Sequence, residues 1–479
     1  MNILRRLTAL VAAVATLAFV ACEEKDNGVQ GGSTEVELTV SPTSVELSAD
    51  GTAQSVIVET NADSWDFVVG ASWLSVEKSG DSLVLSAQKN SGKSSREGEV
   101  VIFAETSGTF VQEVVAVKQL GSGSTTGGDD DEFECSVFME LMVEYYDADG
   151  DGVISDAEAA AVTEMVLTMT DEDTREPITS LKGIKRFVNL TSLDCDCNNI
   201  TSLDLSGMEK LEYVDCSYNL ITDLNIEGCQ NIMFFQAYNN NLTKLDFSDL
   251  PELIYFDVRL NNLNEVDFSN CPKLQVAAVG TNNIMSLNLE GLPSLYTLGC
   301  YENNITTLDV SKLPKLQMLE CYSNNLAELD LTANTELTAL TCQRNLLTDL
   351  NIEGCNLLKK LDCSVNYLAG DLDFSNYPNL YTLNCGANSI TAIDVEACTA
   401  MTTLTCDNTQ ITELNVSTLP LLESLIANDC MLTVMDCSNN LNLETLYLQG
   451  NPLEELILSQ GQGIADLKVD NFDVITYKE

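Results

Sequence analysis

A dense group of acidic residues lies within residues 147–158, whose sequence is DADGDGVISDAE. Six of its positions have the types and the spacing of calcium ligands: Asp147, Asp149, Asp151, Val153, Ser155 and Glu158. The carboxylates supply hard oxygens, the valine a backbone carbonyl and the serine a water-mediated contact, while Gly152 permits the sharp bend. The sequence therefore predicts that this loop binds calcium. The simpler alternative is a solvated acidic turn.

These twelve residues match the EF-hand loop, and the flanking segments have the expected character. We expect the entering helix to include residues 140–146 and an Ala-rich helix to follow over residues 157–169. Since the chain holds one such loop, the opening of paired calcium sensors is not expected. We expect the ion to make residues 134–185 a rigid cap for the repeats that follow.

The composition excludes several classes of function. Against 23 Lys plus Arg stand 73 Asp plus Glu, so the formal charge is −50, which disfavours nucleic acid as a partner. The chain contains no histidine, which excludes catalytic triads and metal sites that use imidazole. Its 479 residues, 45% of them hydrophobic, suffice for two or three domains with real cores.

The first residues have the pattern of an export signal. Residues 1–21 combine Arg5 and Arg6 with an apolar run that is too short to span a bilayer. The segment resembles a bacterial lipoprotein signal, which implies lipidation of Cys22, although Phe19 departs from the usual leucine. Residues 23–26 are similar to the acidic tag of surface lipoproteins in Bacteroidetes-type bacteria, the alternative being an ordinary linker. We therefore predict an outer-membrane lipoprotein exposed on the cell surface.

A small β-domain is predicted between two linkers. Residues 22–33 and 121–133 are low in complexity and cannot bury a core. Between them, residues 34–120 alternate apolar and polar side chains in short runs, such as VELTV at 36–40 and SVIV at 55–58. This pattern predicts a β-sandwich.

Residues 34–120 resemble the BACON family of immunoglobulin-like modules. The resemblance rests on Trp65, the ASWLSV run at 71–76, and the REG run at 96–98. It implies either a glycan contact or a spacer. We expect Trp73 to belong to the core and not to stack on a sugar.

From residue 186 to the end, the chain repeats itself. Twelve of thirteen spacings are 21 residues between the apolar residues that open the units: Leu190, Leu211, Ile232, Leu253, Leu274, Leu295, Leu316, Leu337, Leu358, Leu380, Met401, Leu422, Leu443 and Ile464. Each unit reads approximately LxxLxCxxNxLTxLDLS, which resembles the leucine-rich-repeat consensus. The resemblance implies a mainly β fold, a parallel solenoid of about 14 units. The single 22-residue step, at residues 368–371, predicts a small bulge.

Three columns of residues recur with the repeat. Asparagine occupies the position eight residues into eleven units, where its amide can satisfy buried backbone groups. An Asp or Asn in the L-D-L segment, from Asp204 to Asp436, is expected to cap turns, the alternative being a row of bound cations. Eight of the 17 cysteines lie five residues into a unit, from Cys195 to Cys406. Because in-register parallel side chains give poor disulfide geometry, we predict buried free thiols.

Partner contacts are expected two, four and six residues into each unit, because these positions alternate with the core and face the concave side of such a solenoid. Candidate ligand-binding side chains gather there: Tyr213, Phe234, Tyr238, Tyr255, Arg259, Tyr301 and Tyr322. Asp194, Asp196, Asp215 and Asp257 flank them and favour a basic or hydroxyl-rich ligand. The alternative is that the rings only pack on one another to cover the sheet.

These features predict a lipid-anchored adhesin or recognition protein that binds a host or bacterial surface protein or a glycan. A structural or spacer component of an envelope assembly is an alternative. A polysaccharide-active enzyme is a weaker one, since the carboxylate pair Asp194 and Asp215 would lie on a regular stack without a deep cleft. We predict no catalytic residues.

Overall fold

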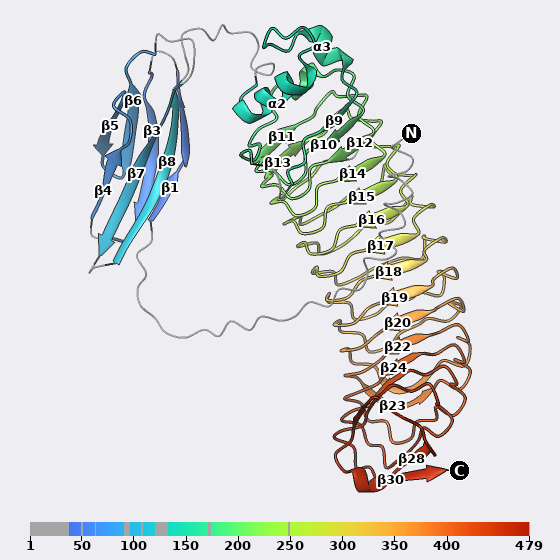
Figure 1. Ribbon diagram of the computed structural model, residues 1–479. Helices are drawn as coiled ribbons and strands as arrows, with labels where there is room; N and C mark the ends of the chain where they lie inside the picture. Colours follow the sequence, from blue (N-terminus) through green and yellow to red (C-terminus); the bar gives the residue numbers. More distant parts are fainter. Residues whose placement is uncertain are drawn as a thin grey trace. The chain divides into compact units, whose positions relative to one another are not determined.

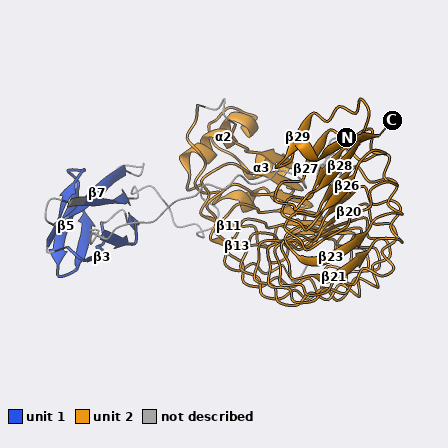
Figure 2. Cartoon of the chain, turned by 90° about the horizontal axis from the view of Figure 1, so that it is seen from below, with its two compact units in different colours: residues 1–127 blue, residues 128–479 orange. Residues whose placement is uncertain are grey.

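The computed structural model describes most of the chain. The described residues are 38–48, 51–62, 64–90, 96–106, 109–119, 133–170, 174–247 and 250–478. The predicted signal segment, Cys22 and the linker residues 121–132 lie outside them. The chain divides into two compact units, residues 1–127 and 128–479 (Figure 2). Within the described residues, every helix is too short or too polar to cross a bilayer.

The first unit is a sandwich of two four-stranded sheets, as predicted (Figure 1). One sheet has the order β1 (Leu38–Ser41), β3 (Gln54–Thr60), β6 (Ser82–Ala87) and β5 (Leu74–Ser79). The other has the order β2 (Ser44–Leu47), β8 (Thr109–Gln119), β7 (Arg96–Thr106) and β4 (Ser64–Val69). Alternate side chains of both sheets, among them Val56, Leu85, Ile102 and Val115, form the core.

Trp73 packs against this core, as expected. A Cβ atom at Gly98 would lie 2.6 Å from the Ala71 Cβ and 3.1 Å from the Trp73 ring, so the glycine makes room for the indole. The Arg96 guanidinium covers the ring at 4.6 Å from its centroid. Contacts within the domain therefore explain the position of the Trp73 ring, and no sugar ligand is needed to explain it.

The second unit begins with two helices, α2 (Ser136–Tyr146) and α3 (Asp156–Ala161). The prediction of a helix over residues 157–169 is wrong, because α3 ends at Ala161 and strand β9 (Glu164–Val166) follows. This strand buries Met165 in the core and pairs in parallel with β10 (Ser192–Asp194). The solenoid sheet therefore begins before residue 186, the predicted boundary.

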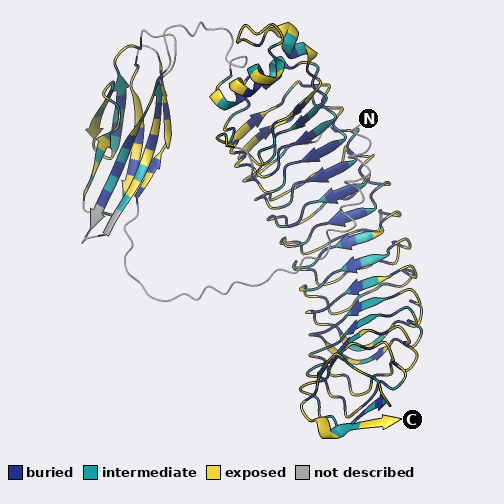
Figure 3. Cartoon of the chain, viewed as in Figure 1, coloured by how far each residue is buried: buried dark blue, intermediate teal, exposed yellow. Residues whose placement is uncertain are grey.

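The solenoid itself is confirmed, with a parallel sheet of 15 strands in the described residues (Figures 1 and 3). After β9 and β10 its strands are β12 (Tyr213–Asp215), β14 (Phe234–Gln236), β15 (Tyr255–Asp257), β16 (Val276–Ala278), β17 (Thr297–Gly299), β18 (Met318–Glu320), β19 (Ala339–Thr341), β20 (Lys360–Asp362), β22 (Thr382–Asn384), β24 (Thr403–Thr405), β25 (Ser424–Ile426), β27 (Thr445–Tyr447) and β29 (Asp466–Lys468). Equivalent residues pair, as Tyr213 does with Phe234 and Phe234 with Tyr255. Every position of the repeat therefore becomes a column that runs along the stack.

Further strands lie outside this sheet. They form the pair β11 (Ser202–Asp204) and β13 (Asp223–Asn225), the pair β21 (Ala369–Asp373) and β23 (Ser389–Asp394), and the group β26 (Val434–Asp436), β28 (Glu455–Ser459) and β30 (Ile475–Lys478). Two short 3₁₀ helices, η1 (Ile184–Arg186) and η2 (Phe472–Val474), complete the described elements. The pairing of β21 with β23 shifts register between Gly370 and Asp371, so the predicted bulge is confirmed.

The asparagine column satisfies the buried turns, as predicted. The Asn324 Oδ1 accepts a hydrogen bond from the Ile305 amide at 3.0 Å. Its Nδ2 donates to the carbonyls of Cys300 at 3.0 Å and Cys321 at 3.1 Å. One side chain thus ties its own turn to the preceding unit, and the same set recurs at other members of the column.

The residue before each asparagine adopts a left-handed conformation that the sequence did not reveal. Leu260 has φ of 55° and Val365 has φ of 53°, although bulky side chains rarely adopt positive φ. The Leu260 amide donates to the Gly280 carbonyl at 3.1 Å in the next unit, and Val365 makes the equivalent bond. Bonds to the neighbouring unit therefore hold each turn in this conformation.

The cysteines in the described residues are free thiols, and all but Cys197 are buried. Burial raises the pKa of Cys195 and of other members of the predicted column well above the ordinary thiol value. A second cysteine column, which the sequence analysis did not identify, contains Cys229, Cys271, Cys355 and Cys398. The Asp and Asn side chains of the L-D-L column cap turns as expected, since Asp309 Oδ1 accepts a hydrogen bond from the Ser311 amide at 2.9 Å and Asn288 Oδ1 accepts one from the Glu290 amide.

Replacement of the Asn324 side chain should destabilise the solenoid. Asn324→Ala leaves several buried backbone groups without partners, so we expect the free energy of unfolding to fall by about 3 kcal/mol. Chemical denaturation followed by circular dichroism measures the change. The exposed neighbour gives the matched control, because Asn325→Ala should cost less than about 0.5 kcal/mol. Equal losses in the two variants would contradict the role given to the column.

Candidate binding face and calcium loop

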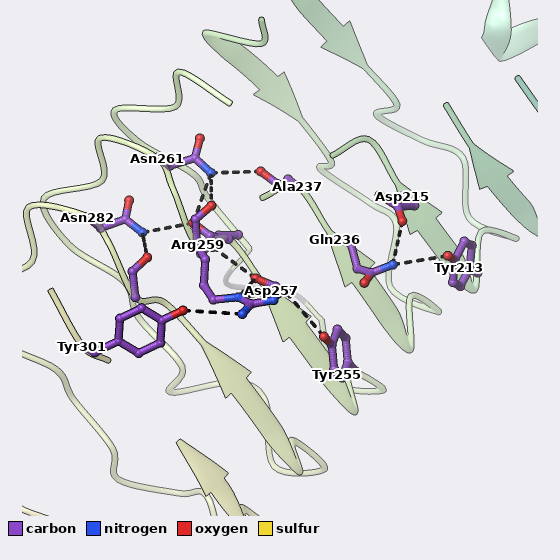
Figure 4. A network of polar contacts seen from close by, with 12 residues as sticks. Tyr213, Asp215, Gln236, Ala237, Tyr255, Asp257, Arg259, Asn261, Asn282 and Tyr301 are labelled. Carbon is purple, nitrogen blue, oxygen red and sulfur yellow. Dashed lines mark hydrogen bonds and ion pairs between the residues drawn. The ribbon is translucent and has the colours of Figure 1, made fainter. Parts of the chain in front are cut away.

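The candidate binding face is the side of the 15-stranded sheet opposite the core, called the strand face below. Its polar side chains are fixed by one another (Figure 4). The Gln236 Nε2 donates to Asp215 Oδ2 at 2.7 Å and to the Tyr213 hydroxyl at 3.3 Å. Burial raises the pKa of Asp215 to about 7, and the charges of Asp194 and Asp196 add to this shift.

An ion pair lies further along the strand face. Asp257, with 1% of its surface exposed, accepts Arg259 Nε on Oδ1 at 2.9 Å and Arg259 Nη2 on Oδ2 at 2.7 Å. Burial alone would lower the pKa of the guanidinium, but the hydrogen bonds and charge of Asp257 raise it. The Arg259 Nη1 also donates to the Tyr301 hydroxyl at 3.5 Å (Figure 4). Arg259 is therefore held in one orientation.

Gly280 lies between Arg259 and Tyr301 and decides their contact. A Cβ atom at Gly280 would lie 2.7 Å from the Tyr301 ring, so the ring occupies the space that a side chain would fill. Tyr322 then stacks on Tyr301, with 4.6 Å between centroids and an angle of 5° between planes. The glycine thus lets an aromatic pair lean toward the arginine.

The same line of side chains continues on the other side of Arg259. The guanidinium carbon lies 5.7 Å from the centroid of Tyr238, and Tyr238 meets Tyr218 edge to face at 4.9 Å. We call Tyr218, Tyr238, Arg259, Tyr301 and Tyr322 the tyrosine–arginine strip. All five side chains keep part of their surface accessible, Tyr218 as much as 45%. The strip is a continuous aromatic and cationic surface within an acidic chain.

The predicted column Tyr213, Phe234 and Tyr255 behaves differently. Phe234 and Tyr255 have only 5% and 3% of their surface exposed, and their rings stack with centroids 6.3 Å apart. Neighbouring parallel strands lie about 4.8 Å apart, which is close enough for such rings to cover one another. This burial favours the packing alternative for both residues, which offer a ligand little surface.

Three residues of the strand face were missed by the sequence analysis. Gln236 and Glu320 lie four residues into their units, and Gly280 lies six residues into its unit. A survey of every residue at these two positions of the repeat would have identified all three. Glu320 is partly buried, and burial raises the pKa of its carboxyl group while the charge of Arg259 opposes the shift.

The predicted calcium loop lies between α2 and α3. Carboxylate oxygens of Asp147, Asp149 and Asp151 lie within 4.8 Å of one another, a spacing that suits ligands of one calcium ion. The Glu158 Oε1 accepts the Ala148 amide at 2.7 Å and its Oε2 accepts the Ser155 amide at 2.8 Å. These hydrogen bonds lower the pKa of Glu158 to about 2, so its charge is present when a cation binds. The residues fit the proposed ion.

The loop is anchored to the first solenoid turns. Arg186 Nη2 donates to the Ile154 carbonyl at 2.6 Å and to Asp156 Oδ1 at 3.2 Å. Phe138 of α2 is fully buried in the solenoid core, and Tyr146 donates to the Glu164 carbonyl at the start of β9. A cation that stiffens the loop would therefore stiffen the end of the stack.

Comparisons with known proteins agree with this architecture. Residues 177–228 match the family described as "Leucine Rich repeats (2 copies)", and residues 37–118 match the "Viral BACON domain". The functional domain of InlJ from Listeria monocytogenes, described as including a cysteine ladder, is 33% identical, with 68% of this chain and 70% of that chain covered and a TM-score of 0.63. The chain belongs to the leucine-rich-repeat family.

A second solved structure has the same fold at lower identity. The internalin InlF from Listeria monocytogenes is 20% identical, with 71% of this chain and 96% of that chain covered and a TM-score of 0.53. No curated protein matches the chain. A leucine-rich-repeat solenoid of this kind is a binding or recognition module.

Phe234 should contribute to stability and not to a free surface. Phe234→Ala removes a buried ring that stacks on Tyr255, so we expect a loss of about 3 kcal/mol in the free energy of unfolding. Tyr218→Ala, at an exposed ring, should cost less than about 1 kcal/mol. Chemical denaturation of the two variants measures both free energies of unfolding. A loss for Phe234→Ala as small as that for Tyr218→Ala would contradict the packing role and favour Phe234 as a surface residue.

Calcium should stabilise the chain through the loop. At the affinities of about 10⁻⁴ to 10⁻³ M typical of extracellular sites, 10 mM calcium should add about 1 to 3 kcal/mol. Thermal unfolding with calcium or with a chelator measures the shift. The double variant Asp149→Asn and Asp151→Asn keeps the loop hydrogen bonds but removes two charges, so its shift should be smaller, whereas Asp223→Asn should leave it unchanged. An equal shift in the double variant would exclude the loop as a calcium site.

Proposed function

We propose that this protein is a lipid-anchored cell-surface recognition protein that binds a surface protein or a glycan through the strand face of its solenoid. The observation that carries the proposal is the tyrosine–arginine strip, an accessible aromatic and cationic surface whose members hold one another in place. The leucine-rich-repeat fold supports a binding role.

The strip has the chemistry of a binding hot spot. Tyrosine and arginine are enriched where partners bind tightly, because large rigid side chains give much contact at a small entropic cost. Asp257 and Tyr301 fix Arg259, and Tyr301 and Tyr322 support each other by stacking. A partner would therefore meet a surface that needs little rearrangement. The surrounding carboxylates favour a partner with basic or hydroxyl groups.

The cell-surface part of the proposal rests on the first residues. The pattern of residues 1–21, with Cys22 after them, is that of a lipoprotein signal. The family match at residues 37–118 supports a module that acts as a spacer or an additional glycan contact. The calcium loop would cap the solenoid at the end where its core would otherwise be open to water.

The binding experiment uses the full chain on an array of glycans and surface proteins. Once a ligand is found, Tyr238→Ser combined with Tyr322→Ser should weaken binding by about 30-fold, as loss of a hot spot does. Arg259 is not a suitable target, because its loss would leave the buried charge of Asp257 without a partner.

Tyr367→Ser is the matched control, because Tyr367 is exposed in the same solenoid but lies outside the strip. It should leave the affinity unchanged. Binding that survives the double variant would contradict the strip as the contact surface. Protease treatment of intact cells tests the location, and release of solenoid fragments is the expected result.

A further inference from the structure

We propose that the strand face carries a second divalent-cation site, separate from the loop at residues 147–158. Its ligands are carboxylate oxygens of Asp194, Asp196 and Asp215, with the Ser217 hydroxyl beside them. Calcium is the ion that suits these oxygens best. The site does not depend on the ligand proposed above.

The geometry fits one ion. Asp194 and Asp215 lie at equivalent positions of paired strands, and Asp196 lies two residues after Asp194 on the same face. One carboxylate oxygen from each of the three lies within 4.8 Å of the other two. Calcium binds oxygen at about 2.4 Å, so two ligands of one ion are at most about 5 Å apart. The three oxygens therefore fit around a single calcium ion.

Two of the three carboxylates, those of Asp196 and Asp215, have no cationic partner within the part of the chain that the structure describes. Asp215 has only 9% of its surface exposed. Asp257, at the equivalent position two strands further along, is also buried but has Arg259 as its partner. A counter-charge stabilises the ionised form of a buried carboxylate, and at Asp215 an external cation can supply it.

Two buried oxygens at the cluster have no hydrogen-bond partner, and this observation is independent of the acidic residues' spacing. They are Asp196 Oδ1 and the hydroxyl oxygen of Ser217, a fully buried residue. The Ser217 amide donates to Asp215 Oδ1 at 3.0 Å, and its carbonyl accepts the amide of Cys197, the residue after Asp196. Ser217 is thus a neighbour of both Asp215 and Asp196. Buried polar atoms are normally satisfied, so these point to an absent partner.

The ligand oxygens are held in position by their neighbours. Gln236 Nε2 donates to Asp215 Oδ2 at 2.7 Å, and Thr168 Oγ1 donates to Asp194 Oδ1 at 2.9 Å. Such outer contacts orient carboxylates for a metal ion. A cation bound here could coordinate carboxylate or hydroxyl groups of a ligand. It would lie near Tyr213, whose hydroxyl accepts a hydrogen bond from Gln236.

The test counts calcium ions bound to the full chain by calorimetry. The wild-type chain should bind two, and the loop variant Asp149→Asn with Asp151→Asn should bind one. Adding Asp196→Asn, which preserves the shape of the side chain, should weaken the remaining site at least tenfold. Asp223→Asn, added to the loop variant instead, should have no effect. Circular dichroism shows whether each variant is folded.

Terbium provides a second readout, because nearby tyrosines such as Tyr213 transfer excitation to a bound lanthanide. In the loop variant, tyrosine-excited terbium emission should persist and should fall with Asp196→Asn. If Asp196→Asn fails to fold, Ser217→Ala serves in its place and should weaken binding several-fold. No calcium binding by the folded loop variant up to 10 mM would overturn the proposal, as would a remaining site that Asp196→Asn leaves unchanged. Asp196-dependent binding of guanidinium without calcium binding would also overturn it, since a partner's cation would then be the occupant.

Discussion

The buried asparagine column is the interaction on which the rest of the solenoid depends. Each 21-residue turn encloses backbone amides and carbonyls that water cannot reach, and Asn324 and its equivalents bond them within and between units. Backbone bonds to the next unit hold the left-handed residue before the asparagine, as at Leu260 and Val365. Because the same bonds recur at the same place, adjacent strands stack in register, and side chains of equivalent position line up along the strand face.

The regular stacking of the strands creates repulsion between like charges on the strand face. Columns of side chains four and six residues into each unit bring carboxylates close together in a chain of formal charge −50. Arg259 neutralises the charge of Asp257 by an ion pair. Because Gly280 has no side chain, the Tyr301 ring fits beside it and its hydroxyl contacts the same guanidinium. At Asp215 the described residues supply only hydrogen bonds. The charge and hydrogen bonding of the strand face thus differ from one unit to the next, although the backbone conformation repeats.

The beginning of the solenoid needs a cover, because the first rung has no earlier unit to bury its core. Helix α2 supplies it with Phe138 and Met142, and β9 adds a strand before the first regular repeat. The loop between α2 and α3 is joined to this cap through Ile154 and Arg186. Calcium bound there would act on the stability of the cap and, through in-register stacking, on the rungs after it.

The sequence by itself determined the features that repeat or that are local. The 21-residue period and its consensus predicted the solenoid, because one stacking solution satisfies every unit, and the single 22-residue step predicted the bulge near Gly370. The spacing of carboxylates from Asp147 to Glu158 predicted a loop whose oxygens converge. Only the tertiary structure decided which side chains stay accessible. Phe234 is buried by its stack with Tyr255, whereas Tyr301 leans over Gly280, and the helix after the loop stops at Ala161 because Met165 enters the core. The exposure of these side chains and the length of this helix depend on residues from other units. The periodicity of a single segment does not reveal those contacts.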